Sequence, residues 1–235
     1  VSCSSGISGA KAAKEFKMHA AVTDNQYILG DADCELIVIS TRHNSHGQLV
    51  QQALAANKHV FVEKPLCLNQ ADLDTINSLM SQPDNTRQLT VGFNRRFSKL
   101  TQQLIKLVRA TEEPIAISYT VNAGFIPLDH WTQDPAIGGG RLLGEVCHFI
   151  DLCRYITSSP IVTASIVSLK KADIAADSWQ ILLGFANGST AAIQYLTNSN
   201  KSLPKEHIVV SSAGKTLVID NFRTLECWGF GPGKS

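Results

Sequence analysis

The chain lacks several features that would assign it to a class at once. Its 235 residues include 21 basic and 20 acidic side chains, giving a formal charge of +1, so no strong net field gathers nucleic acid or anionic lipid. No apolar run approaches the roughly 20 residues that span a bilayer. We therefore expect a small-molecule partner, and neither a nucleic acid nor a membrane.

The six cysteines include no Cys-x-x-Cys pair. No secretory signal is recognisable, which favours reduced thiols in a cytoplasmic protein. Disulfides are also unnecessary, because a chain of this length that is 44% hydrophobic can bury on the order of 70% of its unfolded surface. One or two ordinary globular domains are expected.

The first part of the chain alternates helix and strand patterns. Leu36-Ile37-Val38-Ile39 is nearly continuous in apolar residues, which is typical of a parallel strand covered by helices on both faces. Ser8 is a candidate N-cap for the first helix. The predicted helices are 8–18, 48–56 and 70–80, and the predicted strands are 34–40, 59–62 and 88–93. This order predicts a doubly wound sheet.

After position 96 the pattern changes to a helix followed by long alternating strands, which favours a mainly antiparallel sheet. Asn187-Gly188 and the segment 213–215 are predicted hairpin turns. The residues 229–233 are typical of a loop. The predicted elements are a helix at 98–109 and strands at 115–123, 162–169, 179–185 and 190–196. We expect domains at 1–93 and 94–235.

Three motifs stand near the ends of predicted elements. Glu63-Lys64-Pro65 follows the strand 59–62, so Lys64 is placed in the crevice where open α/β sheets bind ligands. Val91-Gly92-Phe93-Asn94-Arg95-Arg96-Phe97 follows another strand. Further on, three glycines, Gly138 to Gly140, precede a helical segment that contains Glu145 and His148. Together these motifs predict one active site.

In this order the three motifs resemble those of the Gfo/Idh/MocA oxidoreductases, a family that includes glucose-fructose oxidoreductase and inositol dehydrogenase. The resemblance covers most of the chain and is closest to the dehydrogenase-like half of two-module bacterial oxidoreductases, so an upstream domain is implied. The implied fold is α/β: an incomplete Rossmann-type doubly wound parallel sheet, followed by an α+β domain with a mainly antiparallel open-faced sheet. Homo-oligomerisation through that open face is implied as well.

The resemblance also implies an NAD(P)-dependent oxidoreductase. It would transfer a hydride between the nicotinamide and a hydroxyl or keto carbon of a sugar, sugar derivative or cyclitol. A complete dinucleotide fold opens with Gly-x-Gly-x-x-Gly, which this sequence lacks. We therefore expect that one strand-helix unit of about 25 to 30 residues is absent from the front. The resemblance implies that the chain is truncated at its C-terminal end as well. The sequence does not decide between NAD and NADP.

Lys64 and His148 are the candidate catalytic residues. By resemblance Lys64 lies near nicotinamide and substrate, where an ammonium stabilises a developing alkoxide, and His148 is the acid-base group. The family's aspartate four positions before the histidine is Gly144 here. Glu145 is three positions before His148, on one helical face with it, and is a candidate for orienting it or relaying its proton.

The remaining candidates form two groups. A polar loop after the strand 34–40 and the Glu-Lys-Pro motif are implied to contact the cofactor, whereas two arginines, an indole and a carboxylate are expected to bind substrate. The cofactor-binding candidates are Ser4, Ser40, Thr41, His46, Glu63, Lys64 and Pro65. The substrate-binding candidates are Arg95, Arg96, Trp131 and Asp151.

Two other functions compete with this interpretation. Gly144 and the absent glycine loop are compatible with a catalytically silent cofactor- or ligand-binding regulatory module on the same fold. A metal-dependent hydrolase would have enough histidine and cysteine side chains as ligands. Their spacing in the sequence does not match a metal-binding motif, so no metal site is predicted. Its candidate ligands are His43, His46, His130, His148 and Cys147.

Overall fold

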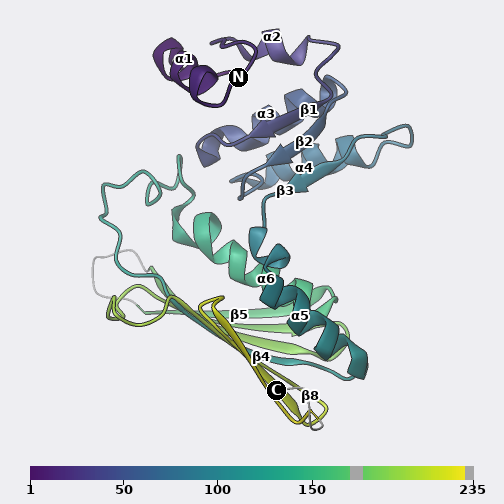
Figure 1. Ribbon diagram of the computed structural model, residues 1–235, viewed down its shortest axis with the longest axis vertical. Helices are drawn as coiled ribbons and strands as arrows, with labels where there is room; N and C mark the ends of the chain where they lie inside the picture. The colour runs from purple at the N-terminus through teal and green to yellow at the C-terminus, as the bar shows by residue number, and fades with distance from the viewer. Residues whose placement is uncertain (170–176, 231–235) are drawn as a thin grey trace. The chain divides into compact units, whose positions relative to one another are not determined.

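A computed structural model describes residues 1–169 and 177–230. The chain divides into two compact units, Val1–Gly92 (unit 1) and Phe93–Ser235 (unit 2). Both are drawn in Figure 1 with the element labels used below. Residues 231–233 of the predicted terminal loop lie outside the described residues.

Unit 1 is built on a three-stranded parallel sheet in the order β1-β2-β3. Helices connect the strands, as parallel pairing requires. Apolar side chains from α3, α4 and the strands form its core, including Val50, Val60, Val62 and Ile76. The elements are α1 (Gly6–Glu15), α2 (Asn25–Leu29), β1 (Leu36–Ile39), the 3-10 turn η1 (His43–Ser45), α3 (His46–Ala55), β2 (His59–Val62), α4 (Gln70–Met80) and β3 (Leu89–Val91).

Two expectations for unit 1 are wrong in detail, and one short helix was missed. The first helix begins at Gly6 with Ser5 as its N-cap, so Ser8 lies inside it. The short helix α2 was not predicted; its N-cap Asp24 accepts a hydrogen bond from the backbone N–H of Gln26. β1 is not covered on both faces within the described residues, because Leu36 and Val38 are 53% and 63% exposed.

Unit 2 contains a seven-stranded sheet in the order β10-β9-β8-β4-β7-β6-β5. Among its described strands only β4 and β7 pair in parallel. The strands are β4 (Ala116–Asn122), β5 (Ile161–Leu169), β6 (Ser178–Phe185), β7 (Thr190–Leu196), β8 (Glu206–Ser212), β9 (Lys215–Asp220) and β10 (Thr224–Trp228). The sheet is therefore mainly antiparallel, as predicted.

The helices α5 (Lys99–Val108) and α6 (Cys147–Thr157) lie on one face of this sheet (Figure 1). Their apolar side chains meet the inward positions of the strands, of which Tyr119, Ile193 and Ile208 are fully buried. Alternate positions face the other way, so Leu182 is 61% exposed. The sheet is thus open-faced, and the predicted fold class is confirmed.

Short turns complete unit 2. They are the 3-10 turns η2 (Asn94–Phe97) and η3 (Arg109–Thr111) and the π-helical turn η4 (Leu142–Val146). The predicted turn at 213–215 joins β8 and β9, where Ala213 and Gly214 both have positive φ, as a tight hairpin requires. No helix among the described residues has the length and apolarity needed to cross a membrane.

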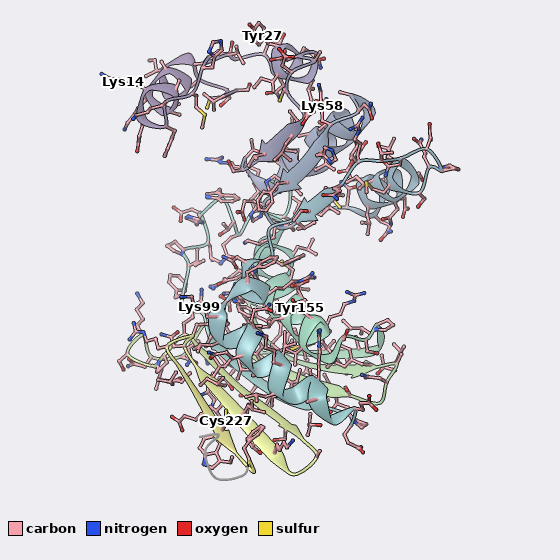
Figure 2. The ribbon with its side chains drawn as sticks, turned by 45° about the vertical axis from the view of Figure 1, so that its right-hand side comes forward. Lys14, Tyr27, Lys58, Lys99, Tyr155 and Cys227 are labelled. Atoms are coloured by element: carbon pink, nitrogen blue, oxygen red, sulfur yellow. The ribbon has the colours of Figure 1, made fainter. Side chains whose placement is uncertain are left out.

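Tyr155 on α6 fixes the contact between the two helices (Figure 2). Its hydroxyl accepts a hydrogen bond from Gln102 Nε2 on α5 at 3.2 Å. The guanidinium groups of Arg96 and Arg109 lie 5.2 and 5.4 Å from the centre of its ring, a distance at which a cation is attracted to an aromatic face. This contact anchors the start of α5 to α6.

Candidate functional site

The carboxyl ends of β1 and β2 bring two of the predicted segments together in unit 1. The strands pair in parallel with Ile39 opposite Val62, and the backbone N–H of Glu63 donates to the carbonyl oxygen of Ile39 at 2.9 Å. Thr41 therefore follows one strand and Lys64 the next, along the same edge of the sheet. This edge is where open α/β sheets bind ligands.

The exposure of these side chains suits a binding edge. Ser40, Thr41 and Glu63 are exposed, Lys64 is half-buried and Pro65 is buried. The hydroxyl oxygens of Thr41 and Ser45 are 2.6 Å apart, which orders the loop after β1. Polar groups are thus presented to solvent above a buried apolar strand end.

His46, the first residue of α3, is fully buried behind this edge. Its Nδ1 lies 2.7 Å from the carbonyl oxygen of Pro65, and its Nε2 lies 3.0 Å from the carbonyl oxygen of Thr41. Both ring nitrogens therefore face backbone of the two loops. Ser4, in contrast, is exposed just before α1, and its proposed role rests on the resemblance alone.

In unit 2, the π-helical turn η4 leads directly into α6. Such wider turns are often found at functional sites. Gly144 and Glu145 lie within the turn, and His148 is the second residue of α6, buried with 9% of its surface exposed. The ring of Phe93 meets the His148 ring edge to face at 6.0 Å, so the imidazole orientation is fixed by packing.

Glu145 is the centre of an ionic network. Arg141 donates to its Oε2 at 2.9 Å, Lys205 donates to its Oε1 at 2.9 Å, and the Tyr195 hydroxyl also donates to it. Burial would raise the pKa of Glu145, but the bond from Tyr195 and the charges of Lys205 and Arg141 lower it from 4.5 to about 2. The carboxylate is therefore a fixed negative charge at neutral pH.

This network bears on the role predicted for Glu145. An efficient proton carrier has a pKa near the working pH, and Glu145 has a pKa of about 2. Its two oxygens are engaged by Arg141, Lys205 and Tyr195. Proton relay through Glu145 stays a prediction, while its observed partners favour a role in holding η4 in place.

The two arginines of the motif after β3 have carboxylate partners. Arg95 donates through Nε and Nη2 to the carboxylate of Glu206 at 2.8 and 2.6 Å, and the hydroxyl of Tyr119 also donates to Glu206. Arg96 donates through two nitrogens to Asp151, which raises the pKa of Arg96. Substrate binding by Arg95, Arg96 and Asp151 stays a prediction; two of the three are paired with each other.

The glycine turn holds the segment that contains Trp131. A Cβ on Gly138 would lie 2.4 Å from the Cα of Thr132 and 2.6 Å from the carbonyl oxygen of Trp131, so only glycine permits this approach. Trp131 is half-buried, and its ring lies 5.9 Å from that of His130. The substrate contact predicted for Trp131 is not tested by this geometry.

Sequence reasoning missed the residues that surround Glu145 and Arg95. Tyr195 and Lys205 are 50 and 60 positions from Glu145, so no local pattern connects them. Only the four-residue spacing of Arg141 and Glu145 is readable as a helical ion pair. The described residues hold no group of three or more His, Cys, Asp or Glu side chains arranged to bind a metal ion.

Comparison with known proteins agrees with this geometry. Residues 3–93 match the family model described as "Oxidoreductase family, NAD-binding Rossmann fold", under the name GFO_IDH_MocA. Residues 112–216 match the GFO/IDH/MocA C-terminal domain. The chain belongs to the Gfo/Idh/MocA family. The family predicted from the three motifs is thereby confirmed.

Two curated relatives illustrate the similarity. The chain is 31% identical over 144 residues to myo-inositol 2-dehydrogenase of Thermotoga maritima, covering 60% of this chain and 41% of that protein. It is 23% identical over 158 residues to levoglucosan dehydrogenase of Pseudarthrobacter phenanthrenivorans, covering 63% and 39%. The aligned part of the chain thus spans about two fifths of the length of each of these two relatives, 41% and 39%.

Solved structures share the fold. An NAD binding oxidoreductase from Klebsiella pneumoniae superposes with a TM-score of 0.87 at 19% identity, over 99% of this chain and 67% of that one. Levoglucosan dehydrogenase in complex with NADH and levoglucosan superposes with a TM-score of 0.84 at 20% identity, over 96% and 65%. At sequence identities this low, the structural likeness shows a shared fold and nothing further.

Proposed function

We propose that the protein is an NAD(P)-dependent oxidoreductase that transfers a hydride between nicotinamide and a hydroxyl or keto carbon of a sugar, sugar derivative or cyclitol. The observation that carries the proposal is Lys64, at the carboxyl end of β2 beside the loop of Thr41. Relatives named inositol and levoglucosan dehydrogenases support the substrate class. An NADH-bound relative supports NAD as the first cofactor to test, with NADP second.

The roles of the residues follow from their chemistry. The bound dinucleotide would supply the hydride acceptor or donor through its nicotinamide. The candidate contacts to the dinucleotide are Ser4, Ser40, Thr41, His46, Glu63, Lys64 and Pro65. Lys64 carries an ammonium whose N–H groups stabilise negative charge on the substrate oxygen. His148 accepts or returns the hydroxyl proton, since an imidazole exchanges protons near neutrality.

The proposal also covers the partners of the protein and its location. The open face of the seven-stranded sheet is the proposed homo-oligomer contact, supported by apolar side chains such as Leu182 and Val167 that are 61% and 65% exposed. Arg95, Arg96, Trp131 and Asp151 are the proposed substrate-binding residues. A cytoplasmic location and an upstream domain are part of the same proposal.

The first test is a fluorescence titration of NADH and NADPH. It uses this chain and a version extended by an amino-terminal strand-helix unit with the Gly-x-Gly-x-x-Gly loop. We expect the extended protein to bind one nucleotide, because the loop and helix N-terminus hold the pyrophosphate. Failure of both proteins to bind either nucleotide would overturn the cofactor assignment.

A second test uses turnover of a panel of sugars and cyclitols. Lys64→Met in the nucleotide-binding protein should lower kcat by roughly 10²- to 10³-fold, the range for loss of one donor that stabilises developing negative charge on oxygen. Lys106→Met, at an exposed position on α5, is the matched control and should leave kcat unchanged. Equal rates for the two variants would remove Lys64 from the mechanism.

A catalytically silent module is the second candidate. It is favoured by Gly144 in the place of the family's aspartate and by the low pKa of Glu145, about 2, which does not suit a replacement acid-base group. Nucleotide binding by the extended protein without turnover of any substrate in the panel would support this candidate. Turnover that depends on Lys64 would exclude it.

A further inference from the structure

The predicted cofactor contact His46 has a geometry that assigns it a different task. Its side chain is fully buried, and its two ring nitrogens lie within hydrogen-bond distance of the carbonyl oxygens of Pro65 and Thr41. A ring enclosed on all sides, with both polar atoms engaged by backbone, does not reach a ligand at the sheet edge. It does reach the two loops that form that edge.

We propose that His46 is a positioning residue that fixes the loop after β1 and the Glu-Lys-Pro segment after β2 at a set distance from each other. The proposal rests on the proposed function. Pro65 is the neighbour of Lys64 in the chain, so a bond to its carbonyl oxygen fixes the backbone that carries the ammonium. The bond to Thr41 fixes the neighbouring cofactor loop through the same rigid ring.

The strand register explains why such a connection is needed. Hydrogen bonding between β1 and β2 ends with Glu63 N–H donating to Ile39, and beyond it the two loops have left the ladder. His46 begins α3, which is joined to the first loop by η1. The imidazole thus connects the two loops at Thr41 and Pro65, two residues beyond the last paired residues of the strands. Without this connection the ends of the loops could open locally.

Histidine suits this place better than other polar residues. A flat ring with a nitrogen on each side spans two acceptors with only two rotatable bonds. A neutral imidazole has one N–H and donates one of the two bonds, whereas the imidazolium donates both. The glutamine amide carries both of its N–H donors on one nitrogen, so it can donate to one carbonyl oxygen but cannot place a donor nitrogen on each side as the imidazolium does. His46→Gln is therefore a partial replacement and His46→Ala a complete loss.

The test compares His46→Ala and His46→Gln with Val50→Ala, a cavity-forming control one turn further along α3. Val50 is also fully buried but bonds to neither loop. Amide hydrogen exchange is followed at 41–45 and 63–67. We expect His46→Ala to speed exchange in both segments by about tenfold or more, as local opening becomes easier, with a smaller change in His46→Gln and none in Val50→Ala. Equal exchange in His46→Ala and Val50→Ala would overturn the proposal.

Nucleotide affinity and kinetics in the extended protein connect this geometry to function. A misplaced ammonium should lower kcat in His46→Ala by about 10- to 100-fold, because errors of about 1 Å are that costly, and NADH should bind more weakly. Unchanged kcat and affinity would also overturn the proposal. If the unsubstituted extended protein binds no nucleotide, the proposed function fails, while the exchange comparison still decides whether His46 fixes the loops.

Discussion

Glu145→Gln should destabilise unit 2 because it leaves two cations without their counter-charge. The side chain of Arg141 is only 1% exposed, and those of Glu145 and Lys205 are 21% and 46% exposed. The amide of glutamine can still accept a hydrogen bond from Tyr195, but it does not neutralise Arg141. An unpaired buried charge is among the costliest defects in a folded protein.

The expected magnitude follows from the pKa of Glu145. Folding lowers it from 4.5 to about 2, and each unit corresponds to about 1.36 kcal/mol. The carboxylate therefore contributes about 3 kcal/mol to the free energy of unfolding, in line with the about 3–5 kcal/mol lost when one partner of a buried pair is removed. Since the folded-state pKa is depressed, this contribution is present above pH 4.5 and is lost as the pH falls toward 2.

Urea denaturation followed by tryptophan fluorescence measures this loss. All three tryptophans, Trp131, Trp179 and Trp228, belong to unit 2, so their emission reports the unit that contains the network. The difference between the unsubstituted protein and Glu145→Gln should be about 3 kcal/mol at pH 7 and should shrink steadily below pH 4.5. Glu226→Gln, on an exposed position of β10, is the control and should match the unsubstituted protein.

Two results would contradict this prediction. A difference at pH 7 below about 1 kcal/mol would mean that solvent already screens the charges, as at a surface ion pair. A difference that stays constant between pH 7 and pH 3 would mean that the effect comes from packing and not from the charge of Glu145. In either case the ion pairs of Glu145 would not be what holds η4 in place.

Three smaller predictions concern the packing around the candidate site. Gly47→Ala should destabilise unit 1 by about 1–3 kcal/mol, measured by urea denaturation with far-UV circular dichroism, because a Cβ there would lie 2.6 Å from Asp72 Oδ2 and 2.9 Å from its Cβ. Asn69→Ala should cost about 1 kcal/mol in the same assay, since Asn69 caps α4 by accepting from the backbone N–H of Asp72 at 2.8 Å. Arg96→Lys should cost unit 2 about 1–2 kcal/mol by tryptophan fluorescence, because lysine does not form the two-nitrogen bond to Asp151.

Matched substitutions separate these causes from general effects. A Cβ on Gly6 would meet only Thr23 Cγ2 at 3.8 Å, so Gly6→Ala should be neutral or stabilising. Asn77→Ala on exposed α4 surface and Arg154→Lys on exposed α6 surface should be nearly neutral. Losses equal to those of the test variants would show that close packing, capping and bidentate pairing are not responsible.

Local sequence patterns predicted the bounds of those elements in which the pattern runs from the first residue to the last. β2 (59–62), α4 (70–80) and β7 (190–196) have the predicted bounds, because alternation and helical periodicity extend through the whole element. The short helix α2 was missed because five residues are too few for a periodic signal. β1 was expected to be covered on both faces, since an apolar run does not reveal which of its side chains meets a helix.

Only some residues of the candidate site could be predicted, because only some of them lie in a local sequence pattern. Lys64 and His148 lie in motifs that can be read along the chain. The spacing of Glu145 and His148 suggested a direct pairing on an α-helix, but the intervening residues begin in a π-helical turn, where the i,i+3 relation of an α-helix does not hold. Two of the three partners of Glu145, Tyr195 and Lys205, come from β7 and the segment before β8, which only the tertiary fold brings near.

The central position of β4 has a consequence for how unit 2 assembles. This strand is the first of its sheet along the chain, yet its two neighbours are β7 and β8, which follow it by many residues. Contacts between distant segments form late and slowly. During synthesis both edges of β4 therefore stay unpaired until β7 and β8 have been made. Unpaired strand edges promote aggregation. A polypeptide that ends before Glu206 lacks β8, so one edge of β4 would stay unpaired. Aggregation through β4 is therefore expected before β8 has been synthesised.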